Sequence, residues 1–219
     1  RGDGVRPNAI TYNIAMHACS LKGDTDGMVR LFNDMQKVWH LDLGVDTFNT
    51  VIMGFAHQGD TEQAESYLQK LTQLGLQPNQ QTYINMLQAF ARSPTPDLPR
   101  MHTHFLAMRK SAEAPTTAAA AMVMEALSRT GQVTMAQQYL QEIDRAGLKP
   151  DEGVMIALLR GYSHLYSSSI QDGVQRQDGS ASSSESSELL LRRVQEVLVL
   201  MDKHNVALSR SVIRAVLVP

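Results

Sequence analysis

The fold of this chain is decided by residues 45–79, which read VDTFNTVIMGFAHQGDTEQAESYLQKLTQLGLQPN. Gly59 and Gly75 are suited to the left-handed backbone that ends a helix, and Pro78 prevents the second helix from continuing. Apolar residues in the second half have the i, i+3, i+4, i+7 spacing of one helix face, at Ala64, Tyr67, Leu68 and Leu71. The stretch therefore predicts a helix, a tight turn, a second helix and a proline-containing turn.

The same signals recur along the chain about every 35 residues. The segment Thr47-Phe48-Asn49 has counterparts in Thr11-Tyr12-Asn13 and Thr82-Tyr83-Ile84, and we predict the three threonines as N-caps and the aromatic residues as core. Repetition at this period is typical of helix pairs that bury their apolar faces against each other. We therefore predict an all-α fold, an α-solenoid of stacked helix-turn-helix units at 9–44, 45–79, 80–116, 117–151 and 152–209.

Two segments depart from this regular pattern. Residues 167–187, within the fifth unit, are rich in Ser and nearly without apolar side chains. Such a composition favours disorder, so we predict an unstructured insert between two helices. Residues 210–219 look like the start of a further unit, and their apolar residues predict more repeats on either side or a protein partner covering this edge.

Composition excludes several classes of protein. The formal net charge is -2 and hydrophobic residues make up 43%, which argues against a polybasic tail protein. A single cysteine, Cys19, excludes a disulfide framework and a cysteine-based zinc site. No apolar run reaches the ~18 residues of a membrane span. Because phosphate-binding and catalytic signatures are also absent, the sequence predicts no enzyme, cofactor, metal or small-molecule substrate.

The recurring elements together resemble the pentatricopeptide repeat family, with repeats of the P type. They are Pro-Asn or Pro-Asp, then Thr-Tyr-Asn or Thr-Phe-Asn, then Gly-Asp, at a period near 35 residues. The resemblance implies that first helices line a concave face and second helices pack outside. It also implies binding of single-stranded RNA in mitochondria or chloroplasts, with one base read per repeat.

The resemblance assigns base-reading positions unevenly. It implies first readers at Asn13 and Asn49, closing readers at Asn79 and Asp151, and a residue sandwiching the base at Ile10. Only unit 45–79 has both readers, a pairing that in the family favours pyrimidines, cytosine above uracil. We expect a buried Phe48 to leave Asn49 exposed in the groove beside Asn79, and the alternative is that Asn49 only hydrogen-bonds the first helical turn.

A stripe of cations is predicted near the ends of the first helices. Its members are Lys22, His57, Arg92, Arg129 and His164. In the family this region carries cations that face RNA phosphates, and such cations give salt-dependent affinity that does not depend on sequence. The alternative interpretation is that basic residues complement the dipole at a helix C-terminus, and the two interpretations are compatible.

Two functions remain open at this point. The first is an RNA-binding adaptor of mitochondria, or of chloroplasts, that acts in transcript processing, stability or translation without catalysis of its own. The second is a structural or scaffolding solenoid, for instance a subunit of an organellar ribosome or another assembly. Apolar first readers at Ile84 and Ile156, together with Gly44 as a closing residue, favour the scaffold.

Overall fold

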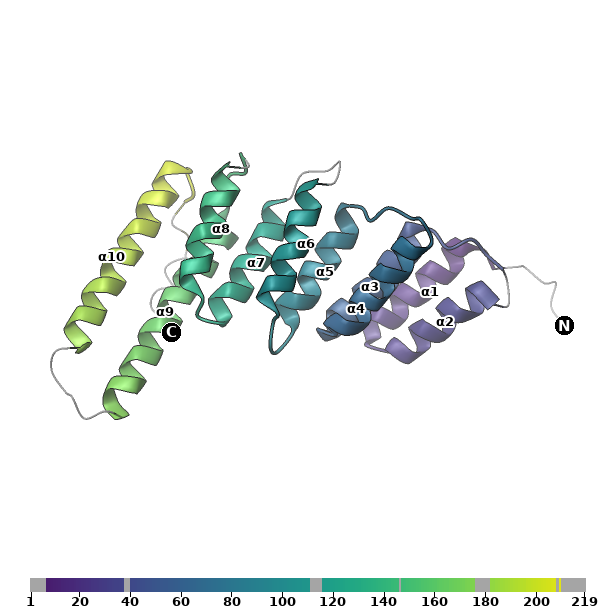
Figure 1. The fold of residues 1–219 in the computed structure, drawn as a ribbon, viewed down its shortest axis with the longest axis horizontal. Coiled ribbons are helices and arrows are strands. Elements are labelled where there is room, and N and C mark those ends of the chain that lie inside the picture. The colour runs from purple at the N-terminus through teal and green to yellow at the C-terminus, as the bar shows by residue number, and fades with distance from the viewer. Residues whose placement is uncertain are drawn as a thin grey trace. The chain divides into compact units, whose positions relative to one another are not determined.

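The computed structural model describes residues 7–37, 40–110, 116–145, 147–175, 182–207 and 209. Within these residues there are ten α-helices and no strand, so the predicted all-α solenoid is confirmed (Figure 1). The helices are α1 (Ala9–Lys22), α2 (Thr25–Lys37), α3 (Val45–Gln58), α4 (Thr61–Gln73), α5 (Gln80–Arg92), α6 (Leu98–Lys110), α7 (Thr117–Arg129), α8 (Val133–Arg145), α9 (Glu152–Gln175) and α10 (Ser182–Lys203). Each predicted unit holds two of them.

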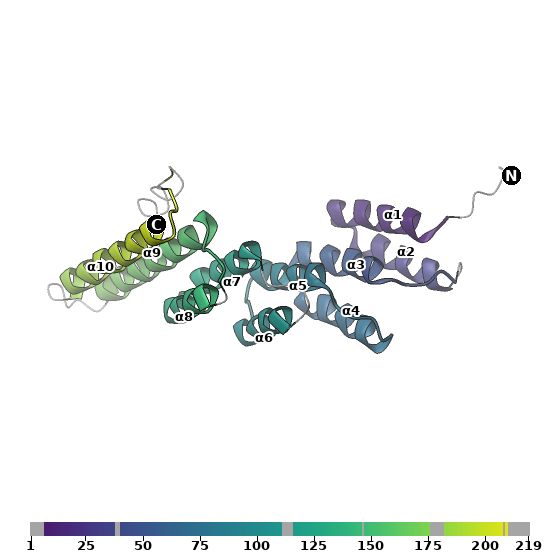
Figure 2. The same ribbon diagram turned by 90° about the horizontal axis from the view of Figure 1, so that it is seen from above.

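The chain divides into two compact parts, an N-terminal part up to residue 115 and a C-terminal part from residue 116. In the N-terminal part α3 contacts both α1 and α5, while α2, α4 and α6 each pack on the first helix of their own pair (Figure 2). Phe48 is the predicted core aromatic that is fully covered, and its ring lies 5.4 Å from that of Phe32. Tyr12 and Tyr83 are only half-buried.

Helix ends follow the predicted glycines but not the predicted threonines. Gly59 adopts a left-handed conformation, φ 71°, and a Cβ there would lie 2.9 Å from the carbonyl oxygen of Arg92, so a side chain would be strained and crowded. The N-caps are Asn8, Gly44 and Asn79, three residues before each threonine. The N-caps lie three residues before the predicted ones because a threonine at the third helical position can close a capping box with an asparagine N-cap.

The C-terminal part is built from α7 to α10. Here α7 contacts α8 and α9, and α9 contacts α10. The interface uses small and aliphatic residues, with Ala119, Val123, Met124, Val154 and Leu158 all buried. No helix within the described residues is long and apolar enough to cross a bilayer.

The insert predicted as unstructured is largely helical. α9 continues to Gln175 and α10 begins at Ser182, so helix covers most of residues 167–187. Poverty in apolar residues limits burial, but a helix satisfies its own backbone hydrogen bonds, and this segment has no proline to interrupt them. The predicted further unit at 210–219 lies outside the described residues.

Candidate nucleic-acid interface

One face of the N-terminal part combines α1, α3 and α5. Residues with the i, i+4, i+7, i+11 spacing share one face of a helix, and we call the set from the three helices the first-helix face. It consists of Ile10, Ile14, His17 and Leu21 from α1, Asp46, Thr50, Met53 and His57 from α3, and Gln81, Asn85, Gln88 and Arg92 from α5. The sequence offsets are 36 and 35 residues, so repetition places equivalent positions side by side.

A cleft of about 300 Å³ opens on this face. Its lining comes from three helices and the turn before α5, and comprises His17, Asp46, Asn49, Thr50, Met53, Asn79, Gln81 and Asn85. All but Met53 carry polar side chains, and three of them are carboxamides of asparagine. The cleft can therefore offer both donors and acceptors to a flat polar ligand.

The two predicted readers of unit 45–79 meet at this cleft. Asn49 Nδ2 donates to Asn79 Oδ1 at 3.1 Å, and Thr82 Oγ1 donates to Asn49 Oδ1 at 2.7 Å. Asn79 is exposed, but Asn49 is only 7% exposed. The expectation that Asn49 is exposed was wrong, because α5 covers the side of α3 that Phe48 leaves open.

Asn79 also fixes the start of α5. Its Oδ1 accepts from the backbone N–H of Thr82 at 3.0 Å, while its own N–H donates to Thr82 Oγ1 at 3.1 Å. This reciprocal capping box holds the Asn79 side chain beside the cleft. The predicted closing reader is thus also a helix cap.

The first unit lacks this arrangement. Its closing residue is Gly44, which gives α3 no side-chain cap, and Asn13 Oδ1 is buried without a hydrogen-bond partner. The predicted sandwiching residue Ile10 is 67% exposed on the first-helix face. The first unit thus brings none of its predicted readers into a pair.

In the C-terminal part Asp151 acts as a helix cap. Its Oδ1 accepts from the backbone N–H of Val154 at 3.0 Å. The residue at the first-reader position is Ala121, which cannot hydrogen-bond a base. One turn further along α7, Glu125 pairs with Arg160 of α9 at 3.3 Å, so the charge of Arg160 is already neutralised.

The predicted cation stripe is partly assembled. Arg92 is exposed at the end of α5, and its Nη1 donates to the carbonyl oxygen of His57 at 3.4 Å. Lys22 is exposed at the end of α1 but does not occupy the position equivalent to His57. His57 lies two residues before the C-cap glycine of α3, and in α1 that position is held by Leu21. Arg129 is exposed at the end of α7 in the other part.

The environment of His57 disfavours its charged form. Burial lowers the pKa of the imidazole below its ordinary value, and the positive charge of Arg92 lowers it further. His17 acts in the same direction, while the contact with Ser20 raises the pKa. His57 is therefore uncharged near neutral pH, and Arg92 supplies the positive charge beside it at the end of the first-helix face.

Sequence reasoning placed only Asn49 and Asn79 of this lining in the site, and the polar residues that it missed include His17, Gln81 and Asn85. Gln81 Nε2 donates to Asn85 Oδ1 at 2.8 Å, and Asn85 Nδ2 donates to the backbone carbonyl of Asn49 at 3.0 Å. The i, i+4 spacing of Gln81 and Asn85 was visible as a polar helix pair. Their link to Asn49 was not, because it joins residues 36 apart.

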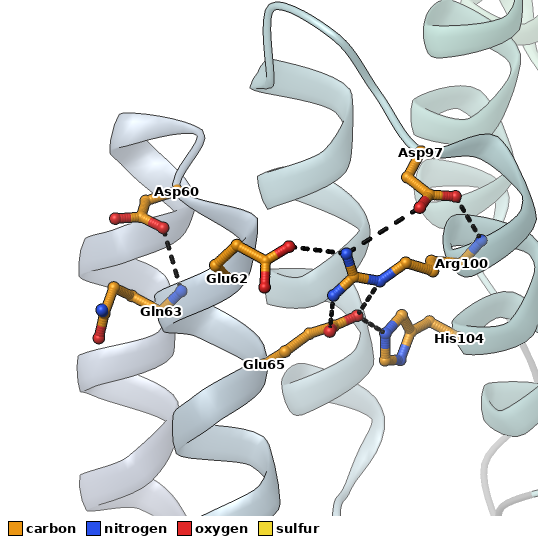
Figure 3. Close-up of polar contacts among 7 residues, drawn as sticks. All are labelled: Asp60, Glu62, Gln63, Glu65, Asp97, Arg100 and His104. Carbon is orange, nitrogen blue, oxygen red and sulfur yellow. Dashed lines mark hydrogen bonds and ion pairs between the residues drawn. The ribbon is translucent and has the colours of Figure 1, made fainter.

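A second polar cluster lies on the second helices. Arg100 of α6 binds Glu62 and Glu65 of α4, and His104 Nε2 lies 3.0 Å from Glu65 Oε1 (Figure 3). Burial raises the pKa of Glu65, but hydrogen bonds from Arg100 and His104 outweigh it, so the net pKa is lowered. Since Arg100 and His104 of α6 bind carboxylates of α4, the cluster joins the two helices.

Metal-binding groups do not gather in the described part of the chain. No set of three or more His, Cys, Asp or Glu side chains there could hold a metal ion.

Sequence comparison identifies repeats in the N-terminal part. The sequence model of the PPR repeat family matches residues 43–92, and a model of the PPR repeat matches residues 10–38. A pentatricopeptide repeat-containing protein of Arabidopsis thaliana is 26% identical over 53% of this chain and 24% of its own length. Two others from the same plant, one named mitochondrial and one chloroplastic, are 32% and 24% identical over 35% and 73% of this chain. The chain spans a quarter or less of the length of these three relatives.

Solved structures share the fold. The pentatricopeptide repeat protein PPR10 in complex with an 18-nt psaJ RNA element has a TM-score of 0.68 at 20% identity, over 97% of this chain and 27% of that chain. The PPR domain of Arabidopsis thaliana protein-only RNase P 1, in complex with tRNA, has a TM-score of 0.68 at 14% identity, over 94% and 95% of the two chains. At these identities the likeness concerns the fold alone.

Proposed function

Because this chain belongs to the pentatricopeptide repeat family, we propose that it binds single-stranded RNA on the first-helix face of its N-terminal part. The observation that carries the proposal is a cleft lined by polar side chains on the same face as the basic residues His57 and Arg92. The cleft of about 300 Å³ lies toward the starts of α3 and α5, and His57 and Arg92 lie toward their ends. Bases can enter the cleft while phosphates approach His57 and Arg92.

The proposal differs between the two parts of the chain. In the N-terminal part, the exposed side chains of Asn79 and Gln81 provide hydrogen-bonding groups at the cleft. In the C-terminal part, Ala121 lacks them and Arg160 is paired with Glu125. We therefore place base reading in residues 45–92 and assign the C-terminal part at most a backbone contact through Arg129.

The chain's role in the cell is proposed from its relatives. Since two of them are named mitochondrial and chloroplastic, we place this protein in an organelle, with the mitochondrion as first choice. There it would act as an adaptor in transcript processing, stability or translation without catalysis of its own. Any nuclease activity would come from a separate protein or domain.

A salt titration with labelled single-stranded RNA tests the binding proposal. Affinity for a 20-nucleotide RNA of mixed sequence should fall steeply as salt rises, by a log–log slope of about 0.7 per phosphate contact. Arg92→Gln should lower this slope by roughly one contact, whereas Arg30→Gln, on the second helix α2, should not change it. Absence of binding at low salt would overturn the proposal.

A scaffolding function is the second candidate, supported by one observation. Ile10, Ile14 and Leu21 are 66–67% exposed on the first-helix face of α1. Exposed apolar side chains on one helix are typical of contacts with another protein or with further repeats. Saturable binding of a protein partner without any RNA affinity at low salt would favour this candidate.

A further inference from the structure

Helix α1 carries a row of aliphatic side chains that the two following first helices lack. We call Ile10, Ile14 and Leu21, which lie 66–67% exposed on the first-helix face, the apolar row. The equivalent positions are all polar on the next two helices, namely Asp46, Thr50 and His57 on α3 and Gln81, Asn85 and Arg92 on α5. The repeat therefore does not require apolar residues at these positions, and the row is a feature of α1.

Packing within the protein does not use the apolar row. Helix α1 contacts α2 and α3, and the residues that it buries there are Met16 and Ser20, on another face. Single exposed leucines are ordinary on a protein surface, whereas aliphatic side chains gathered in one row mark a contact surface. Covering the row would remove apolar surface from water, which is favourable.

A further helix pair beside α1 would not cover the apolar row. Helix α3 contacts both α1 and α5, and it still leaves the equivalent positions accessible. Asp46 is exposed there, while Thr50 and His57 are half-buried. Neighbours on both sides therefore leave the first-helix face open, and whatever covers the row approaches on that face.

An RNA strand uses the groups of α3 and α5 better than those of α1. Phosphates and base edges are bound by charged or hydrogen-bonding groups, and the apolar row offers neither. One base stacked on Ile10, as the family resemblance implies, leaves Ile14 and Leu21 without a use. The observations therefore favour a protein as the ligand of this row.

The spacing of the row matches one face of a second helix. Ile10 and Leu21 are 11 residues apart in α1, which is about 16 Å along the axis at ~1.5 Å per residue. A partner helix of about three turns laid along α1 can place an aliphatic side chain beside each member of the row, as amphipathic helices do on apolar surfaces. Met53 of α3, half-buried at the cleft, adds apolar surface on the same face.

The charges around α1 favour an acidic partner. Its 14 residues contain no Asp or Glu and end on Lys22. Lys22 and Arg92 are exposed at the same end of the face, whereas Asp46, its carboxylate, lies at the other end. Asp24, just after α1, is engaged in capping α2, because its Oδ1 accepts from the backbone N–H of Gly27 at 2.8 Å. Carboxylates at one end of a partner helix would therefore complement this end of the face.

We infer that the apolar row is the docking site for an amphipathic α-helix of a partner protein, with aliphatic residues along one side and carboxylates at the end that lies over Lys22. The inference goes beyond the proposed RNA binding, because it divides the first-helix face between two ligands. The helix occupies α1 and the strand occupies α3 and α5. An adaptor built in this way holds its protein partner beside the bound RNA.

Selection from a displayed library of helical peptides, each about 16 residues long, tests this inference on the full chain. Peptides that bind should share an aliphatic stripe with helical spacing and carry Asp or Glu at one end. Anisotropy titrations with one selected, labelled peptide should show saturable binding that Ile14→Ser weakens by about tenfold or more. Leu74→Ser is the matched control, since Leu74 is 55% exposed at the end of α4 and should not affect the peptide.

The charge complementarity has its own test. Lys22→Gln should weaken the same peptide by about twofold to fivefold, the range for an exposed ion pair. A peptide in which Asp and Glu are replaced by Asn and Gln should bind the unmodified chain and Lys22→Gln equally well. An equal effect of Lys22→Gln on both peptides would show that charge does not select the partner and would overturn that part of the inference.

RNA titrations separate this inference from the proposed function. Ile14→Ser should leave the affinity for RNA of mixed sequence and its salt slope unchanged. Selected peptides without an aliphatic stripe, or a tenfold loss of RNA affinity in Ile14→Ser, would overturn the inference. Self-association that Ile14→Ser abolishes would also overturn it, because a second copy would then cover the row.

The two proposals can also fail separately. Absence of RNA binding at low salt, with peptide binding intact, would overturn the proposed function and leave the docking site standing. Thermal unfolding followed by circular dichroism verifies that each variant is folded.

Discussion

Asn49 donates through Nδ2 to Asn79 Oδ1 at 3.1 Å, joining the first helix of one repeat to the N-cap of α5, the first helix of the next repeat. The same Asn49 oxygen accepts from Thr82, so one buried carboxamide connects α3 with the start of α5. This relationship makes a residue expected to read a base into a structural link between repeats. Its consequence is that a substitution of Asn49 affects the packing of α5 on α3.

Replacement of Asn49 by alanine should destabilise the N-terminal part. The change removes the buried hydrogen bonds that Asn49 makes with Thr82 and Asn79, and a hydrogen bond contributes about 0.5–1.5 kcal/mol even though Thr82 Oγ1 can still donate to Asn79 Oδ1. Denaturant unfolding measures the loss. Thr50→Ala is the matched control, since its hydroxyl bonds only to the Asp46 carbonyl of its own helix, and an equal loss in both variants would contradict the linking role.

Replacement of Gly44 by asparagine should stabilise α3. The position has φ -92°, and a Cβ there would meet no atom within 4 Å, so the side chain fits without strain. The new carboxamide would accept from the backbone N–H of Thr47, as Asn79 accepts from the backbone N–H of Thr82. The expected gain is a few tenths of a kcal/mol, measured as a raised Tm.

Two further variants separate this cap from the removal of a glycine. Gly44→Ala limits the unfolded chain in a similar way but provides no acceptor, so it should gain less than Gly44→Asn. In an Asn13→Ala background the gain from Gly44→Asn should shrink if the two carboxamides pair. Equal gains from alanine and asparagine would contradict the capping explanation.

Glu65 should contribute stability that acid removes. Because its folded pKa is lowered, its contribution is present above the unfolded value, 4.5, and is lost as pH falls through the folded pKa. Glu65→Gln should therefore cost about 1 kcal/mol of unfolding free energy at pH 7 and almost nothing near pH 3. Denaturant titrations across this range test it.

Glu62 provides the control for Glu65, since both bind Arg100 from the same helix. The Glu62 side chain is 75% exposed and that of Glu65 is 17% exposed, so solvent screens the first ion pair far more. Glu62→Gln should consequently change stability much less. A larger loss from Glu62→Gln than from Glu65→Gln would contradict the importance of burial here.

RNA affinity should rise as pH falls through the His57 titration. Burial and the charge of Arg92 lower the pKa of His57 in the protein alone, while a nearby phosphate favours the protonated ring. The pKa is then higher in the complex, so binding takes up a proton and strengthens between pH 8 and pH 5.5. Titrations at fixed ionic strength measure this.

The variant His57→Gln should lose most of that pH dependence. His17 also lowers the pKa of His57, and His17→Gln therefore serves as the companion variant that reports its share. If the pH dependence of RNA affinity is the same in His57→Gln as in the unmodified chain, His57 does not contact the strand.

Sequence reasoning located the helix pairs and missed most of the cleft. Periodicity and glycines marked the ends of α1 and α3 because those signals act within a few residues. The threonine caps were displaced by three residues, since Asn79 and Thr82 cap reciprocally. The expected insert at 167–187 was wrong because composition reports on burial rather than on backbone conformation.

What the sequence alone determined is the repeating unit: its period, its apolar stripe and its left-handed glycines, all of which depend on contacts within one helix pair. Only the tertiary structure decided which polar side chains form hydrogen bonds within the protein and which are exposed to a ligand. Asn49 is buried because α5 packs on α3, and Asn85 is held between Gln81 and the Asn49 carbonyl, which lies 36 residues away in the sequence. Hydrogen bonds between repeats depend on how neighbouring helices pack, and a pattern within a few residues of sequence does not encode that packing.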